Sequence, residues 1–103
     1  MARFVRTEEV PDPVAAAVGD LLEVRLVENA GTGYVWELAE PPGCLRVVED
    51  VTEVGSLAAV GAASLRVFTL SATAVGSGEL VLVLRRAWEP APLRTLSWPV
   101  TVS

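Results

Sequence analysis

The chain has 103 residues, of which 51% are hydrophobic and 20% charged, and its formal net charge is −5. It contains no histidine and a single cysteine, which excludes Ser-His-Asp and Cys-His catalytic sites, histidine-bound zinc and an internal disulfide. The acidic balance argues against nucleic acid as a partner, and no apolar run approaches the roughly 18 residues that a membrane span needs.

Four stretches alternate between apolar and polar residues, which predicts β-strands because successive side chains of a strand point to opposite faces of a sheet. Trp36 and Trp98 each lie in phase with apolar neighbours, so we expect both in the core. The predicted apolar faces are, in chain order, Leu22-Val24-Leu26, Tyr34-Trp36-Leu38, Leu45-Val47-Val51 and Leu96-Trp98-Val100-Val102.

Two middle segments are apolar on both faces, as expected of covered strands. Residues 64–74 change phase between Val67 and Phe68, which predicts a bulge or a strand covered on both sides. Residues 80–84 read Leu-Val-Leu-Val-Leu and predict a central strand. The Gly-Ser-Gly at 76–78 predicts a turn between them, and therefore a β-hairpin.

Turn signals separate these stretches at regular intervals, which is typical of an all-β sandwich. We therefore predict an immunoglobulin-like antiparallel β-sandwich of six to eight short strands, forming a single domain over residues 1–103. Pro99 cannot donate a ladder hydrogen bond, so its strand is expected at an edge or with that position facing outward. Cys44 follows a Pro-Pro-Gly turn and is expected to be a small buried hydrophobe.

The most unusual segment reads Asn29-Ala30-Gly31-Thr32-Gly33-Tyr34 and is followed by Trp36. Its glycines and its asparagine can adopt left-handed backbone angles, and Thr32 offers one small hydroxyl. Such a loop can approach another surface closely, while the aromatic residues anchor the strand that follows. An ordinary glycine-rich connection between strands is the alternative interpretation.

A second segment, Arg85-Arg86-Ala87-Trp88-Glu89-Pro90, directly follows the all-apolar strand. Tryptophan and arginine are enriched at binding hot spots, so Trp88 is a candidate contact residue. The alternative is that Trp88 caps one end of the sandwich with Arg86 stacked over it. A third segment, residues 58–64, consists of small residues and by itself predicts only a loop.

Together, these three segments resemble the chagasin-type inhibitors of papain-family cysteine proteases. That family has an Asn-Pro-Thr-Thr-Gly-Tyr/Phe loop followed by a tryptophan, then a Gly-x-Gly-Gly loop, then an Arg-Pro-Trp/Phe loop. Here the first motif is residues 29–34, the second survives only as Gly61-Ala62-Ala63, and the third is Arg86-Ala87-Trp88. The match extends roughly from residue 19 to residue 102.

The resemblance implies an immunoglobulin-like sandwich with the three loops side by side at one end. The loop around Thr32 would enter the protease cleft beside the protease's catalytic cysteine and histidine, and the other two loops would grip its walls. Such an inhibitor blocks access and supplies no chemistry, so the chain is expected not to be an enzyme and to need no cofactor. The protease-binding residues that the resemblance implies are Asn29, Ala30, Gly31, Thr32, Gly33, Tyr34, Gly61, Ala62, Ala63, Arg86, Ala87 and Trp88.

The sequence departs from the family pattern at three positions of these loops. Ala30 and Ala87 replace prolines and Gly31 replaces a threonine, and each change is expected to cost about 0.4–1 kcal/mol of preorganisation. We therefore expect an inhibitor weaker than the family norm, or one matched to a different protease. An immunoglobulin-like interaction module without inhibitory activity is the alternative, and burial of Trp88 would favour it.

The remaining expectations concern partners, metals and location. A papain-like cysteine protease is the expected partner, without nucleic acid or membrane, and the chain is expected to be a monomer. No metal site is predicted, because Glu49, Asp50 and Glu53 match no calcium-binding loop and are better explained as a solvated strand edge. The first residues have no apolar h-region, so no secretory signal is predicted and the default location is the cytoplasm, unless a signal has been trimmed.

Overall fold

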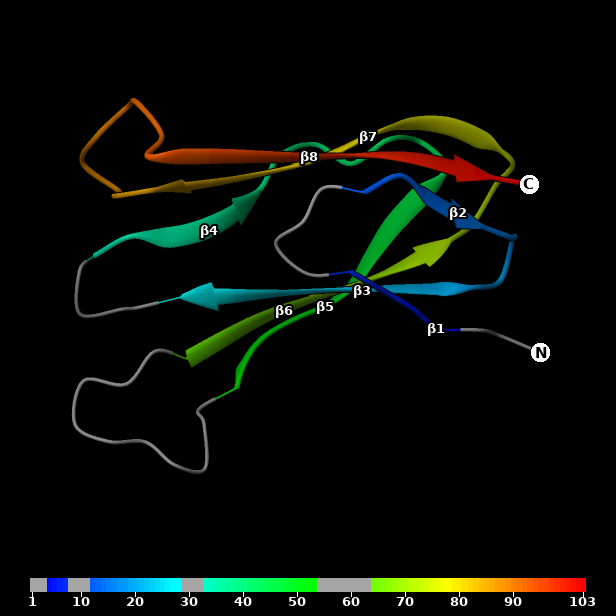
Figure 1. The fold of residues 1–103 in the computed structure, drawn as a ribbon, viewed down its shortest axis with the longest axis horizontal. Coiled ribbons are helices and arrows are strands. Elements are labelled where there is room, and N and C mark those ends of the chain that lie inside the picture. The colour runs from blue at the N-terminus through cyan, green and yellow to red at the C-terminus, as the bar shows by residue number, and fades with distance from the viewer. Residues whose placement is uncertain (1–3, 8–11, 29–32, 54–63) are drawn as a thin grey trace.

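The computed structural model describes residues 4–7, 12–28, 33–53 and 64–103, with residues 4–7 described by their backbone alone. These residues form strands and no helix. One sheet has the strand order β1-β3-β6-β5 and the other has the order β2-β8-β7-β4 (Figure 1). The strands are β1 (Phe4–Thr7), β2 (Val14–Ala16), β3 (Leu21–Glu28), β4 (Val35–Leu38), β5 (Leu45–Glu53), β6 (Ser64–Ala72), β7 (Gly76–Arg85) and β8 (Arg94–Val102).

The inner faces of the two sheets share one apolar core, which follows from the alternation along each strand. β3 buries Leu22, Val24 and Leu26, and β8 buries alternate residues from Leu96 to Val102. Trp36 and Trp98 are both fully buried, so the prediction that they belong to the core is confirmed. The all-β sandwich is confirmed as well, although the short strands β1 and β2 pair with β3 and β8 in parallel rather than antiparallel.

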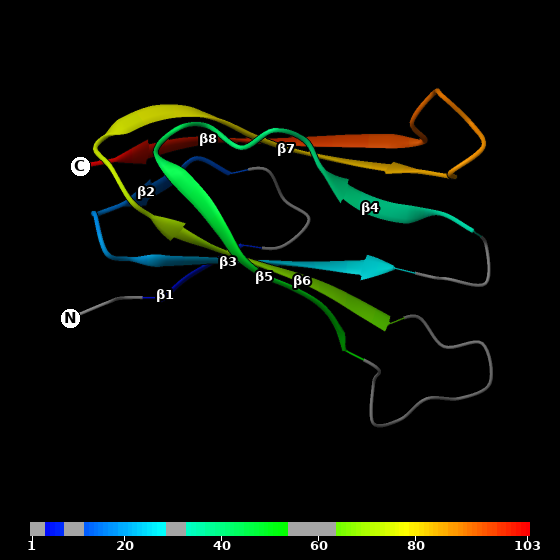
Figure 2. The same cartoon turned by 180° about the vertical axis from the view of Figure 1, so that it is seen from behind.

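Three pairs of strand ends lie at the same pole of the sandwich, the pole at the left of Figure 1 and at the right of the reverse view in Figure 2. The strand register agrees, because Glu28 pairs with Ser64 in one sheet and Leu84 pairs with Arg94 in the other. The pairs are the end of β3 with the start of β4, the end of β5 with the start of β6, and the end of β7 with the start of β8.

The predicted hairpin between residues 64–74 and 80–84 is wrong. β6 lies between β3 and β5 in one sheet, whereas β7 lies between β4 and β8 in the other. Residues 73–75 connect the two sheets, and the Gly-Ser-Gly at 76–78 belongs to β7, where it pairs with the end of β8. β7 is nevertheless the central strand that its apolar run predicts.

A bulge does occur near β6, but it lies in β5. The register between β5 and β6 shifts between Val47 and Glu49, and β6 pairs with β3 without interruption. The extra residue reverses the facing of everything after it, so Val51 is 37% exposed instead of sharing the inner face with Leu45. The same shift places Asp50 opposite the buried Phe68.

Two further expectations concern single residues. β2 pairs only with Val100–Val102 of β8, so within the described residues β8 has no neighbour on that side at Pro99. This arrangement satisfies the requirement that a proline in a strand lies where no ladder donor is needed. Cys44 is 5% exposed and packs in the core cluster, as expected of a small buried hydrophobe.

Candidate functional site

The described ends of the first and third predicted loops meet at the pole defined above. Gly33 has a φ of +80°, a left-handed angle that glycine adopts without strain. A Cβ atom added at Gly33 would lie 2.9 Å from Cη2 of Trp88 and 3.8 Å from Cγ of Arg86. The absence of a side chain at Gly33 therefore allows the Trp88 ring to pack against this backbone.

Arg86 lies close to both aromatic side chains of this site. Its guanidinium carbon is 4.3 Å from the centroid of the Tyr34 ring and 5.8 Å from the centroid of the Trp88 ring. Its Nη1 atom also donates a hydrogen bond of 3.1 Å to Oε1 of Glu89. Cation–π contacts at such distances each contribute about 0.5–1 kcal/mol at exposed positions, so Arg86 links the segments before β4 and after β7.

Trp88 is 70% exposed, which is unusual for a side chain of its size. Leu93, on the same connection between β7 and β8, is 58% exposed. The backbone of this connection is held at two points, where Glu89 donates to the carbonyl of Arg86 and Leu93 donates to the carbonyl of Leu84. The result is an exposed apolar surface on a connection with defined backbone hydrogen bonds.

The twelve residues predicted as protease-binding fall into two groups. Gly33, Tyr34, Arg86, Ala87 and Trp88 lie together at this pole. The others, Asn29, Ala30, Gly31, Thr32, Gly61, Ala62 and Ala63, lie outside the described residues.

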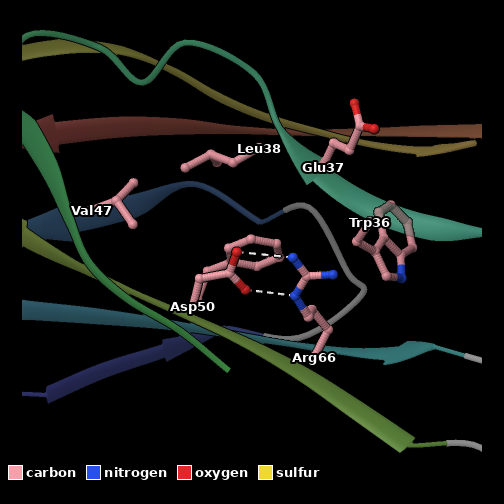
Figure 3. Close-up of a pocket in the computed structure, with 7 residues that line it drawn as sticks. Trp36, Glu37, Leu38, Val47, Asp50 and Arg66 are labelled. Carbon is pink, nitrogen blue, oxygen red and sulfur yellow. Dashed lines mark hydrogen bonds and ion pairs between the residues drawn. The ribbon is translucent and has the colours of Figure 1, made fainter. Parts of the chain in front are cut away.

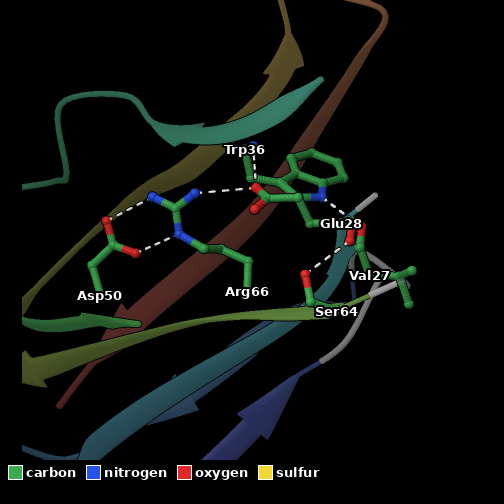
Figure 4. A network of polar contacts seen from close by, with 6 residues as sticks. All are labelled: Val27, Glu28, Trp36, Asp50, Ser64 and Arg66. Carbon is green, nitrogen blue, oxygen red and sulfur yellow. Dashed lines mark hydrogen bonds and ion pairs between the residues drawn. The ribbon is translucent and has the colours of Figure 1, made fainter. Parts of the chain in front are cut away.

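Sequence reasoning did not predict a partly buried polar network near the end of β3 and the start of β6 (Figure 4). The carboxylate of Glu28, 5% exposed, accepts hydrogen bonds from the Trp36 amide at 2.8 Å and from Nη1 of Arg66 at 3.1 Å. Arg66 also donates from Nε and Nη2 to the two carboxylate oxygens of Asp50. The phase of Glu28, the same as that of Leu22, Val24 and Leu26, is the signal that could have identified it.

The ion pairs of this network further favour the charged form of Arg66. The hydrogen bond that Arg66 donates to Asp50 is the largest of the effects that raise the pKa of its guanidinium above the ordinary value. The negative charges of Asp50 and Glu28 act in the same direction, while burial opposes them. The guanidinium is thus a permanent positive charge between two carboxylates.

A pocket of about 370 Å³ opens on the flank of the sandwich between β4 and β5 (Figure 3). Its polar groups already bind one another or a neighbour, since Arg66 pairs with Asp50 and Glu37 pairs with Arg85 at 2.9 Å. Nothing in its chemistry therefore calls for a small-molecule ligand. The lining residues are Trp36, Glu37, Leu38, Val47, Asp50, Arg66 and Phe68.

The described part of the chain lacks the features of two other classes of site. No group of three or more histidine, cysteine, aspartate or glutamate side chains there is arranged to hold a metal ion. No helix in the described ranges is long and apolar enough to cross a membrane.

The fold and this cluster define a β-sandwich that presents an exposed aromatic side chain on connections at one pole. Comparison with known proteins gives the family. Residues 15–102 match the model of the chagasin family peptidase inhibitor I42, and the chain belongs to that family. It is therefore a member of a family of protease inhibitors and not of enzymes.

The curated relatives include two proteins of Entamoeba histolytica. Amoebiasin-1 is 32% identical over 90 residues, covering 86% of this chain and 88% of the relative. Amoebiasin-2 is 31% identical over 87 residues, covering 81% of this chain and 71% of the relative.

Solved structures give the same architecture. The cysteine protease inhibitor EhICP2 from Entamoeba histolytica has a TM-score of 0.88 and 25% identity, covering 99% of this chain and 97% of that one. PbICP-C, solved in complex with falcipain-2, has a TM-score of 0.67 and 18% identity, covering 100% of this chain and 90% of that one. The immunoglobulin-like β-sandwich predicted from the sequence is confirmed.

Proposed function

We propose that this chain is a reversible inhibitor of papain-family cysteine proteases that occludes the active-site cleft with three loops. The loops are residues 29–34, 61–63 and 86–88. The observation that carries the proposal is the exposed Trp88, packed on Gly33 and linked to Tyr34 through Arg86. EhICP2, a cysteine protease inhibitor, shares the fold over nearly the whole chain and supports this choice of target class.

The physical properties of this pole suit an inhibitor that plugs a cleft. Loops that are already held before binding lose little conformational entropy when they dock. An exposed tryptophan can become the buried anchor of an interface of about 800 Å² per partner, the usual size for protease–inhibitor complexes. Burial of Trp88 would have favoured the alternative of a non-inhibitory interaction module, and the exposed side chain weighs against it.

We further propose that residues 1–103 form one chagasin-like domain that acts as a monomer on a papain-like protease. One core cluster, to which strands of both sheets contribute, supports a single domain. The cytoplasmic location expected from the sequence remains a prediction.

An inhibition titration tests the proposed function: the purified chain is added to papain whose active-site concentration is known. We expect competitive, reversible inhibition, with the chain recovered uncut after dissociation. A trypsin-like serine protease serves as the control and is expected to remain fully active. Papain activity that is unchanged at micromolar concentrations of the chain would contradict the proposal.

A further inference from the structure

The polar network beneath the proposed protease-binding pole is not used by the proposed function. Its centre is Glu28, the last residue of β3, whose carboxylate accepts from the Trp36 amide and from Arg66 (Figure 4). Arg66 in turn donates at 2.5 Å and 2.8 Å to the two oxygens of Asp50. The three charged groups thus form a continuous carboxylate–guanidinium–carboxylate chain.

The Glu28 end of this chain joins the two strands on either side of segment 29–32. β3 and β4 belong to different sheets, so no ladder hydrogen bonds connect them. Two other bonds do so: the Trp36 amide donates to Glu28 at 2.8 Å, and the Trp36 indole Nε1 donates to the carbonyl of Val27 at 2.9 Å. These bonds set the distance between the end of β3 and the start of β4.

The Arg66 end of this chain joins Glu28 to the two strands on either side of segment 54–63. Asp50 lies in β5 before that segment, and Arg66 lies in β6 after it. Ser64, the first residue of β6, adds a hydrogen bond of 3.1 Å from its hydroxyl to the carbonyl of Glu28. One network therefore fixes the strand ends from which segments 29–32 and 54–63 leave the sandwich.

Core stability alone does not explain a carboxylate at Glu28. A buried ion pair is often no more stabilising than apolar residues of similar volume, because both charges lose their hydration. The strand already provides the apolar pattern at Leu22, Val24 and Leu26, which a leucine at position 28 would continue. What a leucine could not do is accept the Trp36 amide and hold Arg66 in a defined direction.

We propose that Glu28 and Arg66 are positioning residues for inhibition, which hold the starts and ends of two protease-binding loops in one fixed arrangement. The inference rests on the proposed function, because it assigns these residues a role in the same site. They act through the loops, since Glu28 is buried and Arg66 is committed to two carboxylates.

The principal variant is Glu28→Gln, whose side-chain oxygen can still accept the Trp36 amide while the ion pair with Arg66 is lost. We expect the inhibition constant for papain to rise at least tenfold. The matched control is Glu23→Gln on the same strand, where the carboxylate pairs with Arg25 on the outer face, and its inhibition constant should stay within twofold. An inhibition constant of Glu28→Gln within twofold of the wild type would overturn the proposal.

Asp50→Asn is the second variant, because its side chain is 40% exposed and its replacement should leave the chain folded. We expect a two- to fivefold rise in the inhibition constant. A third variant, Val102→Ala, separates positioning from general destabilisation. Val102 is buried at the opposite pole, so this substitution should lower the thermal midpoint of the chain without touching the network. If Val102→Ala raises the inhibition constant as much as Glu28→Gln at an equal drop in midpoint, the proposed role is wrong.

Hydrogen exchange in the free chain keeps this test separate from the proposed function. We expect the Trp36 amide to exchange at least tenfold faster in Glu28→Leu, which has no acceptor for this amide, with the amides of the central strand β7 unchanged. Failure of the wild type to inhibit papain would overturn the proposed function and, with it, the role in inhibition, while exchange would still report whether Glu28 holds the strand ends. Unchanged exchange at Trp36 would overturn the positioning role even if the wild type inhibits.

Discussion

The Trp88 side chain is highly exposed and yet packs in a defined position. Its ring packs on the Gly33 backbone and lies near the Arg86 guanidinium, yet 70% of it faces solvent. A side chain in this state loses little freedom when a partner covers its remaining surface. This is the physical reason to expect a large share of the binding free energy from a single residue.

Replacing Trp88 with alanine should therefore weaken inhibition of papain by about 30-fold, corresponding to about 2 kcal/mol, the lower limit for a hot spot. The free energy of unfolding should change by no more than about 0.5 kcal/mol, since the side chain is largely exposed. Inhibition assays and urea denaturation measure the two quantities. Val75→Ala, which truncates a side chain 74% exposed at the other pole, is the control and should change neither.

Gly33 is constrained in two independent ways, by its left-handed φ and by the nearby Trp88 ring. Gly33→Ala should destabilise the chain by more than the roughly 1–2 kcal/mol that a left-handed angle costs an alanine, and should weaken inhibition by displacing Trp88. Gly19→Ala is the matched control, because Gly19 has a φ of +97° but no atom within 4 Å of an added Cβ. Equal losses of stability in the two variants, measured by urea denaturation, would show that the Trp88 contact does not constrain Gly33.

At the scale of the strand and its connections, the turn after β7 explains why a proline would suit position 87. Glu89 donates to the carbonyl of Arg86, so Ala87 occupies the second position of a four-residue turn, where proline is favoured. Ala87→Pro should tighten papain inhibition about two- to fivefold, equivalent to about 0.4–1 kcal/mol, by removing conformations of the free loop. Ala87→Gly should change the inhibition constant in the opposite direction, and weaker inhibition by the proline variant would contradict this account.

Most strands could be predicted from alternation alone, because period two reports burial directly. The errors arose where one residue or one short link changes the geometry without changing the pattern. The bulge between Val47 and Glu49 reverses the facing of Val51, and residues 73–75 lead from one sheet to the other where a hairpin was expected. The hydrophobic pattern reveals neither feature. A bulge adds only one residue to a strand, and a connection between two sheets has the same composition as a turn within one sheet.

The candidate site could be predicted only in part, and for a similar reason. Motif resemblance identified Gly33, Tyr34, Arg86 and Trp88, which the fold brings to one pole. The ion pairs could not be predicted, because Arg66 is far from Glu28 in the sequence, and Asp50 reaches Arg66 only through the strand pairing and the bulge. The phase of a strand can identify a polar side chain on its apolar face. The partner of that side chain depends on the pairing register between strands, which the sequence pattern does not give.

At the scale of the whole molecule, both sheets contribute to one core, so the two layers cannot lose their structure separately without exposing the buried tryptophans. Trp36 in β4 and Trp98 in β8 belong to one sheet, and they lie in the same core cluster as Leu22, Val24 and Leu26 of the other sheet. We therefore expect a single cooperative unfolding transition, with coincident changes in tryptophan fluorescence and in far-ultraviolet circular dichroism. Calorimetry should give an unfolding enthalpy of about 60–80 kcal/mol, equal to the van't Hoff value, as for a domain of about 100 residues.

The control is the Val102→Ala variant, which should move both signals to a lower midpoint together, because it weakens the shared core. Two separated transitions, or a midpoint that rises with chain concentration, would contradict the proposal of one monomeric domain.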